Sequence, residues 1–164
     1  RMIKYPKTIE LEQMWCFKDD WTPTRSDDWT GTWLRVKQDV VVRPDPSMVI
    51  AIDYKTGKKA YNEIKHNTQL RLGMLGASFR YPAAETFIAE NWYLDLNDHT
   101  QFKYTRAQVI DSFEEFDKRL RTVTTCVEFQ PNPSAKTCRF CPFRSGEINQ
   151  HTQGTGDCPY AASL

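Results

Sequence analysis

The N-terminal half of the chain contains short segments in which apolar residues alternate with polar ones or form brief runs, and these segments predict β-strands. Residues 8–18 form the first segment and residues 32–43, which are rich in valine, form the second. Residues 48–54 are a short apolar run, as expected of a strand buried on both faces. The sequence Arg43-Pro44-Asp45-Pro46 predicts a turn before it. We therefore expect a sheet that begins with three antiparallel strands.

The connection between the first two strands, residues 19–31, is rich in residues that favour turns. It also contains two large aromatic residues, Trp21 and Trp29. This combination predicts a hairpin loop packed against the core rather than a flexible linker.

A helix is expected at residues 62–79, with Tyr81 and Pro82 ending it. Its apolar side would carry Ile64, Leu70, Met74 and Leu75. Residues 86–96 then return to a strand pattern. By period-two alternation, one face of this strand would carry Ile88, Trp92, Leu94 and Leu96.

The clearest helix signal begins at Thr105, which forms a capping box with Gln108. Apolar residues then recur at helical spacing, at Ile110, Phe113, Phe116, Leu120 and Val123. After residue 129 the sequence is irregular and carries cysteines. The order of strands, helix, strand, helix and tail predicts a mixed α/β fold, with a core at residues 1–130 and a cysteine-rich tail at residues 131–164.

Composition narrows the class of protein but does not identify a partner. Apolar residues make up 40% and charged residues 26% of the 164 residues, as in a globular domain. No apolar run approaches the roughly 18 residues of a membrane span, and no signal peptide is recognisable. The net charge of +1 is neutral evidence about nucleic acid, since a metal-dependent enzyme need only be locally basic.

Asp53 and Lys55 are the most informative pair of residues. They lie two apart at the end of the apolar strand, so both side chains point to the same face. A hairpin would bring Asp39 from the preceding strand beside Asp53. Two converging carboxylates form a hard-oxygen site suited to Mg²⁺ or Mn²⁺. The lysine could orient an attacking water or stabilise developing negative charge, which together suffices for phosphodiester hydrolysis.

The string Ile52-Asp53-Tyr54-Lys55-Thr56-Gly57, with Asp39 before it, resembles the RecB-type branch of the PD-(D/E)XK nucleases. This branch includes the AddB and CRISPR-associated RecB-like exonucleases and many phage exonucleases. The resemblance implies a restriction-endonuclease-like mixed sheet flanked by helices. It also implies that Asp39, Asp53 and the Tyr54 backbone carbonyl bind metal, and that Lys55 is the catalytic lysine.

The resemblance further implies that Gln69 positions DNA or the lysine, because relatives carry a glutamine on the helix after the lysine strand; the alternative is an exposed helical amide. Gln69-Leu70 fits that motif, but Gly73 stands where a tyrosine is usual. Many relatives also have a metal-binding histidine before the first aspartate. None is present upstream of Asp39, so it would lie before Arg1 or be absent, with Glu10 or Glu12 as substitutes or simply solvated strand residues.

Five cysteines and one Cys-x-x-Cys pair fit a disulfide framework poorly and favour metal binding by reduced thiols. Cys138, Cys141 and Cys158 resemble the C-terminal part of the iron–sulfur staple of the AddB-like relatives, which implies a [4Fe–4S] cluster. The fourth ligand would be Cys16, Cys126 or a residue before Arg1, although Cys126 could instead be a small buried residue. One alternative is zinc, held by four cysteines or by three with His151, and the other is that these cysteines bind no metal.

We therefore expect a metal-dependent DNA exonuclease of recombination, repair or phage DNA processing. It would act on linear or single-stranded DNA in the cytoplasm of a bacterium or a phage-infected cell, without a membrane and alongside recombination or replication proteins. Two alternatives remain: a non-catalytic iron–sulfur or zinc-stapled DNA-binding or scaffold subunit, and an endonuclease with the same site. Phosphate contacts are expected from Lys55, Lys58, Lys59, Lys65, Arg71 and Arg80, or these are solvated charges.

Overall fold

The computed structural model describes residues 9–56, 63–128, 130–139, 141–144, 146–149 and 152–160. The chain divides into two compact units, residues 1–121 and residues 122–164. The predicted division into a core and a tail at residue 130 remains a prediction.

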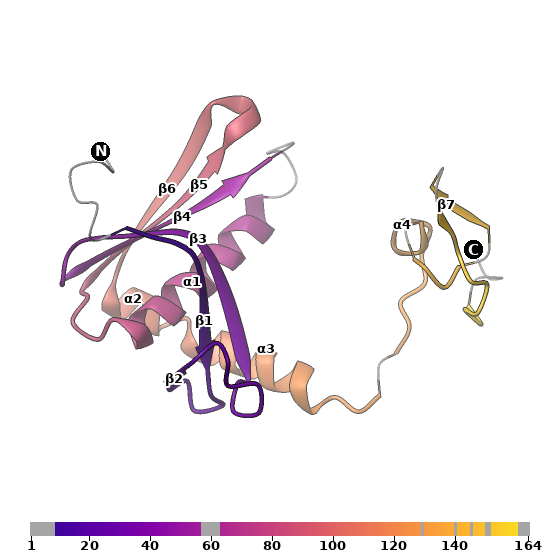
Figure 1. The fold of residues 1–164 in the computed structure, drawn as a ribbon, viewed down its shortest axis with the longest axis horizontal. Coiled ribbons are helices and arrows are strands. Elements are labelled where there is room, and N and C mark those ends of the chain that lie inside the picture. The colour runs from indigo at the N-terminus through magenta and orange to yellow at the C-terminus, as the bar shows by residue number, and fades with distance from the viewer. Residues whose placement is uncertain are drawn as a thin grey trace. The chain divides into compact units, whose positions relative to one another are not determined.

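The first unit contains a six-stranded mixed sheet in the order β2-β1-β3-β4-β5-β6 (Figure 1). Its strands are β1 Ile9–Phe17, β2 Pro23–Thr24, β3 Leu34–Asp45, β4 Met48–Lys55, β5 Thr86–Tyr93 and β6 Asp98–Thr105. Strands β4 and β5 pair in parallel, and the other neighbouring strands pair antiparallel. The predictions of a mixed α/β fold and of an antiparallel start, β1-β3-β4, are confirmed.

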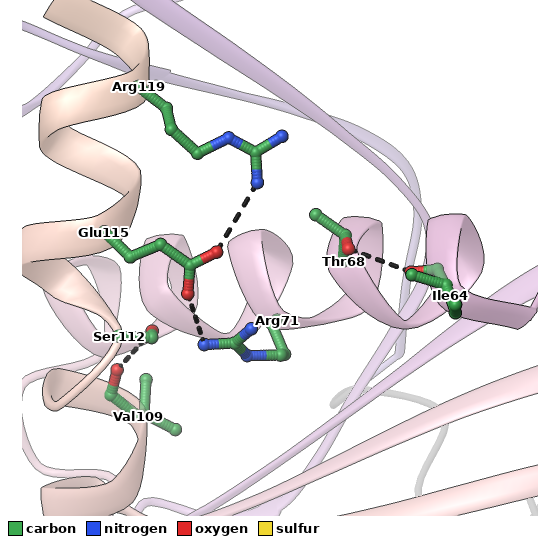
Figure 2. Close-up of polar contacts among 7 residues, drawn as sticks. All are labelled: Ile64, Thr68, Arg71, Val109, Ser112, Glu115 and Arg119. Carbon is green, nitrogen blue, oxygen red and sulfur yellow. Dashed lines mark hydrogen bonds and ion pairs between the residues drawn. The ribbon is translucent and has the colours of Figure 1, made fainter.

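The helices of this unit follow the predicted order with one break. Helix α1 Glu63–Arg80 packs across β3, β4 and β5 on one face of the sheet (Figure 1). Thr105 caps α2 Arg106–Ile110 through the predicted capping box with Gln108. The single helix expected after Thr105 is wrong, because α2 ends before α3 Phe113–Thr125 begins. At the break, Ser112 Oγ donates to the Val109 carbonyl at 2.6 Å, which competes with continued helix formation (Figure 2).

The core lies between α1 and the sheet and includes Trp21. Trp21 is 1% exposed, and its ring lies 5.4 Å from that of Phe79 and 5.6 Å from that of Phe113, measured between centroids. The prediction of a packed loop therefore holds for Trp21. It is wrong for Trp29, which is 77% exposed and stacks under the Arg35 guanidinium instead.

The predicted phase of β5 is wrong. Its buried residues are Phe87, Ala89, Asn91 and Tyr93, whereas Ile88 and Trp92 lie on the other, half-buried face. Leu94 and Leu96 are exposed in the short 3₁₀ helix η3 Leu94–Leu96. This turn leads into β6, a strand that was not predicted. The buried face of β5 is the face that α1 covers, although the other face carries the apolar residues Ile88 and Trp92.

Two further boundaries differ from the predictions. Strand β3 continues through Pro44 to Asp45, and a shift of register between Val42 and Asp45 accommodates the proline. The turn therefore lies one step later, where Asp45 Oδ1 accepts from the Ser47 N–H at 2.8 Å. Ile64 is 82% exposed, because the part of α1 that packs on the core begins near Leu70. Gly57 and Asn62, predicted to end the strand and begin the helix, lie outside the described residues.

The C-terminal end of α1 is fastened by one arginine. The Arg106 guanidinium donates to the carbonyls of Ala84 at 2.7 Å, Tyr81 at 2.8 Å and Ser78 at 3.2 Å. Near the middle of α1, Arg71 pairs with Glu115 of α3 at 2.8 Å. Arg119 approaches the other oxygen of Glu115 at 3.5 Å (Figure 2). These contacts hold α1 against both later helices.

The second unit contains short elements where an irregular tail was predicted. They are α4 Ala135–Cys138 and the two-stranded sheet of β7 Glu147–Asn149 and β8 Thr152–Gln153. Ser134 caps α4 by accepting from the Thr137 N–H at 3.0 Å. Among the described residues of both units, no helix is long and apolar enough to cross a membrane.

Candidate active site

The candidate site lies where β3 and β4 separate. Their paired register reaches Val40 and Ile52. One residue beyond, the Asp39 carboxylate accepts a hydrogen bond from the Tyr54 N–H at 2.9 Å. A side-chain carboxylate thus occupies the position where the next backbone acceptor of β3 would lie. The predicted approach of Asp39 to the Asp53 segment is therefore present in the structure.

A change of face in β3 accompanies this separation. Leu34 and Val36 before the site and Val41 after it all belong to the same core, although Val36 and Val41 would point to opposite faces of a regular strand. Opposite this point, Glu12 of β1 has a left-handed backbone with φ 50. The distortion buries the Gln38 side chain beneath α1 and leaves Asp39 to face β4.

Gly73 of α1 is explained by Gln38. A Cβ atom added to Gly73 would lie 2.6 Å from Gln38 Nε2, closer than unbonded atoms approach. The departure from the tyrosine usual in the related motif therefore has a local steric reason: a buried glutamine of β3 fills the space next to the helix backbone.

Asp53, Lys55 and Gln69 form a closed ring of polar contacts. Lys55 Nζ lies 2.5 Å from Asp53 Oδ2 and donates to Gln69 Oε1 at 2.8 Å. Gln69 Nε2 in turn donates to Asp53 Oδ1 at 3.0 Å. The period-two spacing on β4 places the acid and the lysine on one face, and α1 brings the amide over them.

Asp53 is the buried member of this ring, with only 8% of the residue exposed. Burial raises the pKa of the Asp53 carboxyl, because a charged carboxylate loses hydration there. The hydrogen bond and charge of Lys55 oppose that rise in pKa, whereas the Asp39 carboxylate adds to it. The two carboxylates therefore lie close enough to repel each other, which is the arrangement that a shared cation relieves.

The neighbouring strand adds residues that the sequence analysis missed. In the parallel register, Asn91 lies beside Asp53 and Tyr93 beside Lys55. The Tyr93 hydroxyl lies 3.1 Å from Nδ1 of His66 on α1, and the His66 charge lowers the pKa of Asp53. The signal that could have found them is a polar residue, Asn91, at a position whose strand neighbours face the core.

The donor set fits a hard divalent cation. It offers two carboxylates, and Asp53 Oδ2 has no hydrogen bond of ordinary geometry among the described residues beyond its ion pair with Lys55. In an extended strand the N–H and C=O of one residue point to the same side, so the Tyr54 carbonyl faces the Asp39 side as its N–H does. Within the described residues, no three His, Cys, Asp or Glu side chains form a group able to hold a metal.

The other predicted ligands and phosphate contacts have different surroundings. Glu10 pairs with Arg43 at 3.2 Å and Glu12 with Lys37 at 2.5 Å. Arg71 has its charge matched by Glu115. Lys58 and Lys59 lie outside the described residues, as does His151, the predicted alternative zinc ligand.

The cysteine segments of the second unit are connected through their backbones. The Cys141 N–H donates to the Cys138 carbonyl at 3.1 Å, and the Cys158 N–H donates to the Phe143 carbonyl at 2.9 Å. Cys126 follows the end of α3 and is exposed, so the alternative of a small buried residue is wrong there. In the first unit, Cys16 is fully buried within β1.

The profile of the PD-(D/E)XK nuclease superfamily matches residues 6–145. The six-stranded mixed sheet flanked by helices agrees with the restriction-endonuclease-like fold predicted from the sequence. Curated proteins gave no match. Among solved structures, the chain is similar to SSO0001, with 14% identity and a TM-score of 0.34. The match covers 75% of this chain and 62% of that one, so this chain corresponds to less than two thirds of its length.

Proposed function

The chain belongs to the PD-(D/E)XK nuclease superfamily, and we propose that it is a divalent-metal-dependent deoxyribonuclease whose active site contains Asp39, Asp53, Lys55 and Gln69. The observation that carries this proposal is the ring formed by Asp53, Lys55 and Gln69 beside the Asp39 carboxylate. These charged side chains lie where β3 and β4 separate. Packing of the core does not require an acid, a lysine and a second acid at this point.

Each residue has a role in this proposal. Asp39, Asp53 and the Tyr54 carbonyl hold Mg²⁺ or Mn²⁺, for which oxygen donors are suited. When bound, the ion supplies Lewis acidity and lowers the pKa of a coordinated water. Lys55 orients the attacking water or stabilises negative charge that develops on the phosphate. Gln69 positions Lys55, as its contact of 2.8 Å with the ammonium supports.

The mode of cleavage and the branch of the family are finer proposals. The string from Ile52 to Gly57 resembles the RecB-type branch, many of whose members are exonucleases acting in recombination, repair or phage DNA processing. On this basis the substrate is linear or single-stranded DNA, with recombination or replication proteins as further partners and the cytoplasm as the location.

The test is digestion of end-labelled linear DNA with and without Mg²⁺ or Mn²⁺. Asp53→Ala and Lys55→Ala should each lower the rate by at least about 100-fold, as expected when a group that stabilises transition-state charge is removed. Asp111→Ala and Lys103→Ala remove the same charges at exposed positions outside the site and serve as matched controls. If metal-dependent cleavage persists in both site variants, Asp53 and Lys55 are not the active site and the proposal is wrong.

The same assay separates the alternatives. Cleavage of covalently closed circular DNA would favour an endonuclease over an exonuclease. Tight DNA binding without metal-dependent turnover would favour a non-catalytic DNA-binding or scaffold subunit. The complete set of acid, acid and lysine argues for catalysis, since a binding module does not need it.

For the second unit we propose a [4Fe–4S] cluster bound by Cys138, Cys141 and Cys158, with Cys126 or a residue before Arg1 as the fourth ligand, because Cys16 is fully buried in β1 of the first unit. Backbone hydrogen bonds connect the cysteine segments, but the three thiols are not grouped as metal ligands among the described residues of this structure, so cluster binding requires them to converge. Anaerobically purified protein should be brown, and Cys138→Ser should bleach it. A colourless protein with stoichiometric zinc would replace iron by zinc in this assignment.

A further inference from the structure

Asn91 is a buried amide without a partner. The residue is 0% exposed, and neither its Oδ1 nor its Nδ2 has a hydrogen-bond partner among the described residues. Buried amides in folded proteins are hydrogen-bonded in the great majority of cases, because removal from water without compensation is unfavourable. An apolar residue of the same size would serve the core better at this position.

Asn91 is next to the acid of the candidate site. Its Cα is the register partner of Asp53 in the parallel pairing of β5 with β4, and such strands lie about 4.8 Å apart. Both side chains point toward α1, because Ala51 and Ala89, two residues earlier on each strand, belong to the core under this helix. The unpartnered amide therefore lies on the same face as the buried carboxylate.

The other polar groups near Asp53 already have partners. Gln69 bonds both Asp53 and Lys55, and the Tyr93 hydroxyl contacts His66. Asn91 differs from them because its donor and acceptor are both unused within the described residues. A carboxamide can donate and accept at once, so it suits a small molecule that does the same.

We propose that Asn91 is a positioning residue of the metal site and that its carboxamide binds a water molecule beside the Asp53 carboxylate, through which it contributes to holding the divalent ion. This inference rests on the proposed function, because it takes Asp53 as a metal ligand. Outer residues that orient ligands of a metal typically change its affinity about 10- to 100-fold when removed.

If Asn91 has this role, Asn91→Leu should weaken Mn²⁺ binding without lowering the stability of the fold. Asn91→Leu keeps the size of the side chain and removes both polar groups. Because the unpaired amide no longer has to be buried, the unfolding midpoint in urea should stay the same or rise. The affinity for Mn²⁺, measured by calorimetry on the 164-residue chain, should fall about tenfold or more.

Two further variants serve as controls. Phe87→Leu alters a fully buried residue of the same strand and face, and it should lower the unfolding midpoint while leaving Mn²⁺ affinity unchanged. Asn91→Ser retains a hydroxyl that can bind water, and it should recover part of the affinity lost in Asn91→Leu. A residue needed only for packing would give the reverse order, with stability lost and Mn²⁺ affinity kept.

The experiment separates failure of this inference from failure of the proposed function. If the unaltered protein does not bind Mn²⁺, or Asp53→Ala binds it equally well, both are overturned. If Asp53→Ala abolishes binding and Asn91→Leu leaves it unchanged, only the inference about Asn91 is overturned. Failure of both Asn91→Leu and Asn91→Ser to fold would also overturn it, because Asn91 would then be required by the fold itself.

Discussion

Helix α1 covers two buried regions of opposite character. Toward its C-terminal end lies an aromatic cluster, which consists of Phe17, Trp21, Trp33, Phe79 and Phe113. Toward its N-terminal end lie the polar residues around Asp53. Asp117 contacts the aromatic cluster and Asp53 lies in the polar region, and the pKa values of these two carboxyl groups are shifted in opposite directions.

Asp117 at the aromatic cluster is fully matched by neighbouring donors. It accepts from Arg121 Nε at 2.8 Å and from Trp21 Nε1 at 3.0 Å, and these bonds lower its pKa. Burial instead raises the pKa of Asp53. The carboxylate at the aromatic cluster therefore serves the fold, whereas the one at the polar end is held at a cost to the fold, as expected of a group placed for a ligand.

The largest expected effect is on the aromatic cluster. Trp21→Ala should lower the free energy of unfolding by about 3–5 kcal/mol, because it removes the ring at the centre of the cluster and leaves a cavity. Denaturant unfolding measures the change. Trp29→Ala is the matched control, since Trp29 is 77% exposed, and should change this free energy by less than about 1 kcal/mol. Equal losses in both variants would contradict the contrast.

At the polar end, function should change more than stability. Gln69→Ala should lower metal-dependent cleavage about 10- to 100-fold, because Lys55 and Asp53 lose the amide that orients them. Its free energy of unfolding should fall by less than that of Trp21→Ala, since Gln69 is exposed and the substitution removes hydrogen bonds but leaves no cavity in the core. Gln101→Ala, at an exposed glutamine of β6, controls for the loss of an amide. Full activity of Gln69→Ala would remove Gln69 from the site.

The boundary between the two regions can be probed at Gly73. Alanine in a helix interior is favoured over glycine by about 1 kcal/mol. Here the added Cβ would collide with Gln38 Nε2, so Gly73→Ala should gain less stability than that. In a Gln38→Ala background the gain should be larger by at least about 0.5 kcal/mol. Unfolding of the four proteins of this cycle gives the difference, and additive changes would refute the steric explanation.

The smallest expected effect concerns pH. The pKa of Asp117 in the folded protein is below its ordinary value of 3.8, so the stability that its carboxylate contributes is present above pH 3.8 and is lost as the pH falls toward the lowered pKa. Asp117→Asn should therefore flatten the acid limb of stability between about pH 5 and about pH 2. Urea unfolding across this range measures it, and an unchanged slope would show that other carboxylates dominate.

Strong local patterns were sufficient for most of the fold. The apolar run of β4 predicted a whole strand correctly, and the capping box at Thr105 predicted the start of a helix correctly, because burial and the pairing of backbone N–H groups act there within one segment. Strand β6 was missed, since only Phe102 and Tyr104 of this strand pack against the core, and the residues that alternate with them, Gln101, Lys103 and Thr105, are polar and exposed. Its existence depends on pairing with β5, which a single segment does not encode.

The site was predictable to the extent that it depends on spacing. The same-face placement of Asp53 and Lys55 follows from the period of a strand, and the structure agrees. Asn91 was not found, because the apolar residues Ile88 and Trp92 favoured the opposite phase of β5. Which face of β5 is buried depends on where α1 packs, and that is a tertiary property.

The fastening of α1 by Arg106 has a consequence for how the molecule can respond to a ligand. Three carbonyls at the end of the helix and in the following loop share one guanidinium, and a lysine could not reproduce this planar set of donors. The opposite half of α1 is tied to the sheet through Gln69 and His66, whose partners are the residues of the site. A bound substrate that displaces these partners would therefore move the N-terminal half of α1, while Arg106 holds its C-terminal end in place.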